Sequence, residues 1–367
     1  MMKRTLLALA CVATAAQAAA QSPRLEVVAQ GLDRPWALAF LPGGDFLVTE
    51  KPGAMRIVSA QGAIGAPLTG VPKAEFTGQG GLLDVVLDRG FAGNRTLYFC
   101  FTEAGEKSTN GTALARARLK PDRSGLEDVQ VIFRQAPKMA SRLHFGCRIV
   151  EAPDGTLFMT LGDRFIGMQR AQTLDNHLGK VIRVAKDGSV PPDNPFVNRA
   201  GALPEIYSLG HRNPQGATLD AAGGLWIHEH GPQGGDELNR VRPGLNYGWP
   251  VITYGENYGG GKIGEGLTAK EGLEQPVLHW TPSIAPSGLA RITRTAYGAA
   301  WQGSYVVGAL KFKQLQRVSV DAEGRAVGKP EVLATDIGRV RDVREGPDGL
   351  LYVLTESEPG QLLRLRP

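Results

Sequence analysis

The sequence contains few of the residues and runs that mark several common protein classes. Only three of its 367 residues are cysteine, and no Cys-x-x-Cys-His motif is present, which excludes covalent haem attachment. After the N-terminus no run of about 18 apolar residues occurs, so we expect no membrane span. The chain has no dense basic run and no basic patch interleaved with aromatic residues, so we expect no nucleic-acid partner. The lack of a Gly-x-Ser-x-Gly elbow argues against a Ser-His-Asp hydrolase.

Residues 1–20 have the organisation of a secretory signal peptide. Lys3 and Arg4 form a basic start, residues 6–16 form a short apolar stretch, and small residues at 16–20 give two plausible cleavage signatures. We therefore expect an exported protein, periplasmic or secreted. Loss of the two basic residues lowers the formal net charge from +5 to +3. Such a mild charge does not imply nucleic-acid binding.

Two cysteines remain after residue 20, Cys100 and Cys147. Export permits a disulfide between them, but two cysteines 47 residues apart do not demonstrate one. Cys100 lies in a predicted hydrophobic strand, and we interpret it as a buried apolar thiol.

The strongest pattern is a weak motif that recurs six times, in a chain with 48 glycines and 24 prolines. Each copy starts with a Gly-containing turn and continues with a hydrophobic run. The copies cover residues 42–50, 93–101, 153–160, 222–228, 302–308 and 347–354. Strand-like repeats of roughly 40–50 residues are typical of propeller blades, and longer spacings indicate insertions. We therefore predict an all-β, six-bladed β-propeller with loop insertions, formed as a single domain by residues 21–367.

A second segment, in which apolar and polar residues alternate around a basic residue, follows each hydrophobic run. These segments are 55–58, 114–119, 180–184, 238–241, 315–318 and 362–365. Their period is that of a half-buried strand, and six copies in register favour a propeller over a sandwich. We expect the largest insertions at 186–209 and 246–266. Because propellers protect their edges by pairing the first and last strands, residues 25–28 should complete the blade that ends at 363–365.

Several cationic residues lie just outside the predicted strands. Arg212 and Asn213 follow one another, and Arg339 and Arg341 project from one face of an extended segment. Lys311 follows another predicted strand. If these side chains converge on the central channel, they form a socket for a polyanionic small molecule. The alternative is ordinary surface charge.

Other positions offer a base or metal ligands. His144 precedes a strand and could act as a general base, or be a turn histidine bonded to the backbone. The 229–237 loop is rich in carboxylates and carbonyl-presenting Gly and Pro, which suits calcium. Zinc binding through His228 and His230 lacks a third nitrogen or sulfur ligand nearby. The Gly-rich 258–264 loop has no following helix, so we interpret it as a surface loop without a phosphate site.

Together, these residues lie in strings that resemble the soluble dehydrogenases for aldose sugars that depend on pyrroloquinoline quinone (PQQ), relatives of soluble quinoprotein glucose dehydrogenase. The resemblance covers nearly all of residues 24–367. It is carried by residues 79–84 (QGGLLD), 144–146 (HFG), 209–216 (LGHRNPQG), 229–232 (EHGP), 236–237 (DE), 246–250 (NYGWP), 282–288 (PSIAPSG) and 339–343 (RVRDV). The family fold is a six-bladed propeller, in agreement with the repeat count.

The resemblance implies an enzyme that oxidises aldose sugars at the anomeric carbon to lactones, with PQQ and calcium as cofactors. Electrons would pass to an external acceptor, which could be a small quinone, a dye or a redox protein. The resemblance also implies roles: His144 as general base; Gln79, Arg212, Asn213, Lys311, Arg339 and Arg341 as cofactor-binding groups; Gly231 and Pro232 as carbonyl ligands of calcium; Glu237 and Tyr247 as a second, structural calcium site. Cys147 departs from the pattern, because a smaller or hydroxyl residue is expected there.

Two other classes stay open. A calcium-dependent propeller lactonase would need several carboxylates and amides at one central metal and no cationic socket. A non-catalytic binding propeller would need no cofactor. The sequence specifies neither the sugar nor the physiological acceptor, and it leaves the oligomeric state open between a monomer and a homodimer.

Overall fold

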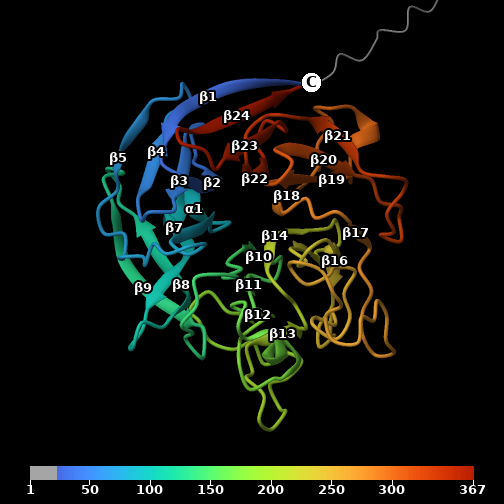
Figure 1. Ribbon diagram of the computed structural model, residues 1–367. Coiled ribbons are helices and arrows are strands. Elements are labelled where there is room, and N and C mark those ends of the chain that lie inside the picture. The colour runs from blue at the N-terminus through green and yellow to red at the C-terminus, as the bar shows by residue number, and fades with distance from the viewer. Residues whose placement is uncertain (1–22) are drawn as a thin grey trace, which may run out of the picture.

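The computed structural model describes residues 23–367, so the expected signal peptide lies outside the described residues. Six four-stranded antiparallel sheets stand around a central axis (Figure 1). The predicted all-β, six-bladed propeller with loop insertions is therefore confirmed. No helix within the described range is long and apolar enough to cross a membrane.

Five blades use four consecutive strands, and the sixth combines three C-terminal strands with the N-terminal one. The first blade contains β2 (Pro35–Phe40), β3 (Phe46–Glu50), β4 (Met55–Val58) and β5 (Ile64–Pro67). The second contains β6 (Leu82–Leu87), β7 (Thr96–Ala104), β8 (Asn110–Leu119) and β9 (Leu126–Arg134). The third contains β10 (Ile149–Glu151), β11 (Leu157–Leu161), β12 (Lys180–Val184) and β13 (Ile206–Leu209). The fourth contains β14 (Pro214–Leu219), β15 (Leu225–Glu229), β16 (Asp236–Val241) and β17 (Leu278–Trp280). The fifth contains β18 (Pro286–Arg291), β19 (Tyr305–Ala309), β20 (Gln314–Val318) and β21 (Glu331–Ala334). The sixth contains β22 (Val340–Glu345), β23 (Leu351–Thr355), β24 (Gly360–Arg366) and β1 (Arg24–Leu32). Among residues 23–367, helical structure is limited to α1 (Phe91–Asn94) and the 3₁₀ turns η1 (Met168–Gln172) and η2 (Ala299–Trp301).

The repeated motif corresponds to the two central strands of each blade. The hydrophobic runs form the second strands, and the segments with a basic residue form the third strands. Every residue of β3, β11, β15, β19 and β23 is buried. Neighbouring blades cover both faces of these strands, which explains a continuous hydrophobic run in place of alternation.

The ring closes as the sequence predicts. Strand β1 pairs antiparallel with β24, with Leu25 opposite Leu365 and Val27 opposite Leu363. The two ends of the described chain therefore complete one blade (Figure 1). This pairing protects an edge that would otherwise be open.

The inner strands of adjacent blades approach each other closely around the axis. A Cβ atom on Gly288 of β18 would lie 2.1 Å from the backbone nitrogen of Val343 on β22. Only glycine permits this contact between backbones.

The cysteines differ from the expectation. Cys100 on β7 is buried, but it forms a disulfide with Cys147, and the two Cα atoms lie 6.0 Å apart. The interpretation of Cys100 as a free thiol is wrong, because packing of the second blade against the third brings the two residues together. The disulfide links β7 to the connection that carries His144.

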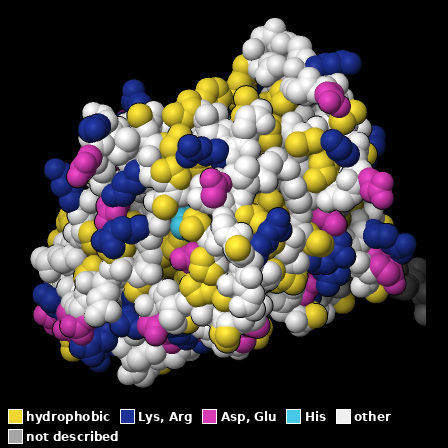
Figure 2. Space-filling view, turned by 90° about the horizontal axis from the view of Figure 1, so that it is seen from below, with side chains coloured by type: hydrophobic (Ala, Val, Ile, Leu, Met, Phe, Trp, Pro, Cys, Tyr) yellow, Lys and Arg dark blue, Asp and Glu magenta, His cyan; other side chains and the backbone are white. Residues whose placement is uncertain are grey.

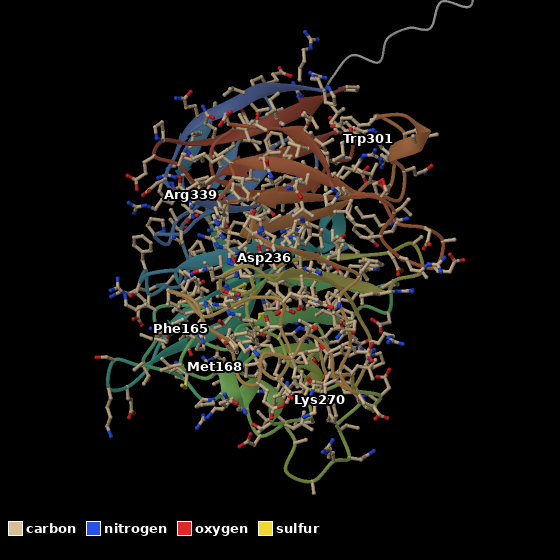
Figure 3. The ribbon with its side chains drawn as sticks, turned by 45° about the vertical axis from the view of Figure 1, so that its right-hand side comes forward. Phe165, Met168, Asp236, Lys270, Trp301 and Arg339 are labelled. Carbon is tan, nitrogen blue, oxygen red and sulfur yellow. A yellow bond between two sulfur atoms is a disulfide. The ribbon has the colours of Figure 1, made fainter. Side chains whose placement is uncertain are left out.

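Most predicted site residues lie in connections on one face of the ring, which we call the loop face. These connections join the second strand of a blade to the third, or the fourth strand to the next blade. They share a face because successive antiparallel strands reverse direction. Figure 3 shows Phe165 and Arg339 on this side, whereas Trp301, between β18 and β19, lies on the opposite side. Tyr247 is an exception, since it lies in the long 242–277 connection between β16 and β17.

Candidate active site

His144 is a buried histidine held by a carboxylate. It lies between β9 and β10, is 5% exposed, and its Nδ1 is 2.6 Å from Oδ1 of Asp163. Because a carboxylate only accepts, Nδ1 carries the proton in the neutral ring and Nε2 keeps a free lone pair. Burial lowers the pKa of His144 below its ordinary value, although the hydrogen bond to Asp163 partly opposes this. The ring is therefore neutral at neutral pH and can accept a proton at Nε2.

Asp163 orients His144 and was missed by the sequence interpretation. It follows β11, and its other hydrogen bonds come from the backbone N–H of Phe165 (2.7 Å) and the indole N–H of Trp249 (2.8 Å). Three donors thus fix the carboxylate. The sequence held a partial signal, since Trp249 lies in one of the family strings, but its contact with Asp163 spans 86 residues.

The backbone around His144 is strained and held from several sides. His144 and Cys147 have φ values of 51° and 77°, a region that favours glycine. The buried guanidinium of Arg164 donates to the carbonyl oxygens of Leu143 (3.0 Å) and Ser141 (2.6 Å). The disulfide of Cys147 adds a covalent constraint. These contacts hold His144 and Cys147 in a left-handed backbone conformation that is unfavourable for residues other than glycine.

A cavity of about 240 Å³ lies on the axis beside this connection. Its wall is formed by five of the blades together with the β9–β10 connection, and it includes Trp36, Lys51, Gln79, Leu83, Phe145, Gly146, Gln215, Leu310, Arg339, Arg341 and Glu356. Three predicted cofactor residues, Gln79, Arg339 and Arg341, therefore meet here. The side-chain oxygen of Gln79 accepts a hydrogen bond from the backbone N–H of His144 (2.8 Å), which connects the cavity to the candidate base.

Glu356 balances the cations of this cavity. It pairs with Arg341 (2.5 Å) and Lys51 (2.8 Å), and half-exposed Arg339 reaches to within 3.7 Å. Although burial opposes the shift, Arg341 and Lys51 lower the pKa of Glu356 to about 2. The sequence interpretation missed Lys51 and Glu356, which lie 305 residues apart in the chain and meet through the ring.

Arg212 and Asn213 lie between the cavity and the β15–β16 connection. The guanidinium of Arg212 donates to the carbonyl oxygen of Gly231 (2.7 Å) and stands over the ring of Trp249, 5.3 Å from its centroid. Asn213 accepts a hydrogen bond from the backbone N–H of Gly146 (3.2 Å), which lines the cavity. Both side chains are therefore part of the same region.

Lys311 differs from the other cations because it is exposed. It follows cavity-lining Leu310 in the β19–β20 connection, and its ammonium lies 5.3 Å from the ring centroid of Phe312. It is therefore a rim residue and does not line the cavity wall.

The predicted calcium ligands Gly231 and Pro232 are buried next to His230. The Gly231 carbonyl accepts from Arg212, and the Gly231 N–H donates to Asp236 (2.9 Å). His230 Nε2 donates to the Pro286 carbonyl (2.7 Å), so that nitrogen has no free lone pair for zinc. Residues 23–367 contain no group of three or more His, Cys, Asp or Glu side chains placed to hold a metal.

Glu237 and Tyr247 lie in a second polar cluster. The Asn239 amide donates to both Glu237 (3.1 Å) and Glu229 (3.2 Å). Burial and the nearby Glu229 raise the pKa of Glu237 to about 8. Tyr247 stacks on His211, with ring centroids 4.9 Å apart. Its hydroxyl donates to the backbone carbonyl of Arg240 (2.6 Å) and accepts from the backbone N–H of Arg242 (2.9 Å).

Comparison with known proteins identifies the family. The model of the Glucose / Sorbosone dehydrogenase family matches residues 32–364. The chain belongs to this family. It is 44% identical to aldose sugar dehydrogenase YliI of Escherichia coli, over 99% of this chain and 98% of that protein. It is 28% identical to quinoprotein glucose dehydrogenase B of Acinetobacter calcoaceticus, over 90% and 85% of the two chains.

Solved structures agree with this assignment. The apo form of the soluble aldose sugar dehydrogenase from Escherichia coli has a TM-score of 0.90 and 42% identity, covering 94% of this chain and all of that one. The PQQ-bound aldose sugar dehydrogenase from Streptomyces coelicolor has a TM-score of 0.77 and 30% identity, covering 94% and 98%. Membership of the Glucose / Sorbosone dehydrogenase family confirms the resemblance seen in the sequence. The protein is therefore an oxidoreductase.

Proposed function

We propose that this protein oxidises aldose sugars at the anomeric carbon to lactones, with PQQ and calcium as cofactors, and passes the electrons to an external acceptor. The observation that carries the proposal is a neutral, carboxylate-oriented His144 next to an axial cavity lined by cationic side chains. The PQQ-bound relative supports the choice of cofactor.

The described residues fit PQQ, which bears three carboxylates. Arg339, Arg341 and Lys51 line the cavity, and Lys311 lies at its rim. The buried Nε atoms of Arg212 and Arg341 have no hydrogen-bond partner within residues 23–367, so each has a donor available for a carboxylate. Gln79 and Asn213 would add amide contacts beside the base.

The predicted calcium ligands Gly231 and Pro232 fit their ion less well than the cavity residues fit PQQ, because one of the two carbonyls is already engaged. The Gly231 carbonyl accepts from Arg212, so a calcium ion held by this carbonyl would have to displace the guanidinium from it. At the second cluster, two carboxylates lie close together and the pKa of Glu237 is raised, which suits a cation. Glu237 with the main-chain carbonyl of Tyr247 would hold the structural ion.

When bound, PQQ would supply a hydride acceptor, and calcium would supply a Lewis acid that makes the quinone a better one. His144 Nε2 removes the hydroxyl proton as hydride leaves the anomeric carbon of the sugar. Asp163 keeps the required tautomer and stabilises the resulting imidazolium. General-base help of this kind is worth about 10²- to 10⁴-fold in rate.

Reconstitution tests the proposal. Purified protein is mixed with PQQ and calcium, and aldoses are screened with an artificial dye. We expect sugar-dependent dye reduction, and we expect His144→Ala to bind PQQ normally while losing most of kcat. Unchanged turnover in that variant would refute the base assignment. If PQQ and calcium change neither the absorbance nor dye reduction, the protein is a binding propeller or a lactonase.

We also propose that the protein is exported with removal of residues 1–20, leaving residues 21–367 as one domain. Sequencing the N-terminus of the mature protein tests the cleavage.

A further inference from the structure

Exposed aromatic and cationic side chains occupy one part of the cavity rim on the loop face. We call them the cationic–aromatic patch: Arg34, Phe76, Arg142, Lys311, Phe312 and Arg339. Phe76 and Phe312 are 43% and 40% exposed. The Arg34 guanidinium lies 5.4 Å from the ring centroid of Phe76, and the Lys311 ammonium lies 5.3 Å from that of Phe312. Each exposed ring is therefore paired with a cation.

Contacts connect the patch to the cavity. Arg339 lines the cavity while half of its side chain is exposed. The Lys51 ammonium, also in the cavity wall, lies 5.8 Å from the ring centroid of Phe76. Arg142 donates to the hydroxyl of Thr77, the residue after Phe76 (3.0 Å). A partner resting on the patch would therefore lie directly over the cofactor cavity.

The patch is separate from the apolar residues around the candidate base. Phe165 packs edge-on against His144, with ring centroids 5.4 Å apart, and Ile166 and Met168 are exposed next to it. Figure 3 shows Phe165 and Met168 near each other and Arg339 further along the same side. The sugar must reach His144 beside these apolar residues. The exposed rings of the patch and the cations Arg34 and Arg142 have no role in the proposed function, so they remain free for another molecule.

A partner has to approach the cavity from this face. Below the cavity, the channel contains a buried ion-pair network in which Arg148 donates to Asp84 (3.1 Å) and Asp342 (3.0 Å). Arg344 also pairs with both carboxylates. Arg148 directly precedes the inner strand β10, and Asp84, Asp342 and Arg344 lie on the inner strands β6 and β22. The network therefore blocks access along the axis from the opposite face.

We propose that the cationic–aromatic patch docks an acidic electron-transfer protein as the acceptor of the enzyme. The proposal rests on the proposed function, which leaves the cofactor reduced by two electrons after each sugar. Two molecules of a one-electron acceptor protein each take one electron in turn, and two protons pass to solvent. The enzyme then returns to its oxidised state.

Composition and charge favour a protein partner. Aromatic residues and arginine are enriched at protein interfaces, and weak redox encounters use small surfaces steered by opposite charge. Glu358, which is 60% exposed, pairs with Arg34 and weakens the positive field of the patch. On the side seen in Figure 2, by contrast, basic and acidic side chains are interspersed. The patch is therefore a favourable docking surface for an acidic partner.

Variants outside the cofactor-binding residues test the proposal. Arg34→Glu and Arg142→Glu reverse a charge in the patch, and Glu358→Gln removes the opposing one. Arg294→Glu makes the same charge change in the β18–β19 connection on the opposite face, so it is the matched control. The reconstituted protein is reduced with sugar, or with dithionite if no sugar reduces it. Its reoxidation by an acidic ferricytochrome c and by a basic one is then followed by stopped flow.

We expect the acidic cytochrome to react faster with the wild type than the basic one does. Arg34→Glu and Arg142→Glu should slow it about five- to tenfold at low salt, and Glu358→Gln should accelerate it. The differences should vanish near 1 M salt, where the Debye length is about 3 Å. Arg294→Glu and the sugar-reduction step should be unchanged.

Equal rates for the two cytochromes, or equal rates for Arg34→Glu, Arg142→Glu and Arg294→Glu, would overturn the docking proposal. Failure of every sugar to reduce the protein would instead overturn the proposed function. Because dithionite reduction still allows the reoxidation measurement, the two failures are distinguishable.

Discussion

Replacing Asp163 with asparagine tests the proposed base directly, because the side chain keeps its size and loses an acceptor. In the native protein Oδ1 accepts from His144 Nδ1 (2.6 Å) and the Phe165 N–H (2.7 Å), while Oδ2 accepts from Trp249 (2.8 Å). An asparagine has one accepting oxygen, so its amide nitrogen must face one of these N–H donors. The substitution therefore removes a hydrogen bond as well as the charge.

The size of the effect depends on which way the amide turns. If its nitrogen faces Trp249, His144 keeps its tautomer but loses the charge that stabilises the imidazolium. If its nitrogen faces His144, the ring proton moves to Nε2 and the base is lost. We expect kcat to fall by about 10²- to 10⁴-fold, the usual worth of a general base. Loss of a hydrogen bond to a charged group should also cost about 1.5–3 kcal/mol in the free energy of unfolding.

The assay is the pH dependence of kcat/KM for the enzyme reconstituted with PQQ and calcium. His144 works only when neutral, so the wild-type rate should fall as the pH drops through its pKa, which lies below the ordinary 6.5. Because Asp163 raises this pKa, Asp163→Asn should move the acid limb to lower pH and lower the plateau.

A matched control and a clear negative result accompany this test. Asp88→Asn removes a mostly buried carboxylate that pairs with Lys186 (2.6 Å), outside the cavity wall, and should leave the pH profile unchanged. A normal plateau in Asp163→Asn, or an acid limb displaced to higher pH, would refute the assignment of His144 as a base oriented by Asp163.

Three further outcomes are expected. Replacing Cys100 and Cys147 with alanine should cost about 4 kcal/mol, because the disulfide closes a 47-residue segment, and reductant should lower the wild-type Tm but not that of the variant. Deleting residues 24–32 should lower the Tm by on the order of 10 °C by exposing β24, whereas a native-like Tm would show that closure contributes little. Since the pKa of Glu237 is raised from 4.5 to about 8, the calcium-free protein should lose stability as the pH rises through this range. Calcium should therefore raise the Tm most above pH 8, and Glu237→Gln should abolish that gain, as calorimetry would measure.

The sequence predicts the central strands of each blade and the closure of the ring, but not the outer strands. The second strands are continuous apolar runs after a turn, so their signal is local. The first strand β10 has three residues, and the fourth strand β5 (Ile64–Pro67) is largely exposed. Such short or exposed segments are defined by pairing with a neighbour, and their own composition carries little information.

In the candidate site, too, some residues have a local sequence signal and others are defined only by distant partners. His144 and Arg341 lie in strings that the family resemblance makes visible. Asp163, Lys51 and Glu356 act through partners far away in the chain, so only the folded ring shows their roles. The Cys100 disulfide depends in the same way on the packing of neighbouring blades.

Glu356 explains how cationic side chains can converge on the axis before an anionic ligand arrives. Arg341, Lys51 and Arg339 gather around its carboxylate, and mostly buried Arg341 without this partner would be an unpaired charge that costs several kcal/mol. Lys51 follows β3 in the first blade, whereas Glu356 follows β23 in the last. These blades are neighbours because β1 pairs with β24. Closure of the ring therefore does more than protect an edge, since it also creates the charge balance of the cavity. A protein without β1 should consequently lose affinity for PQQ under conditions where the other blades remain folded, and a titration of PQQ absorbance would measure that loss.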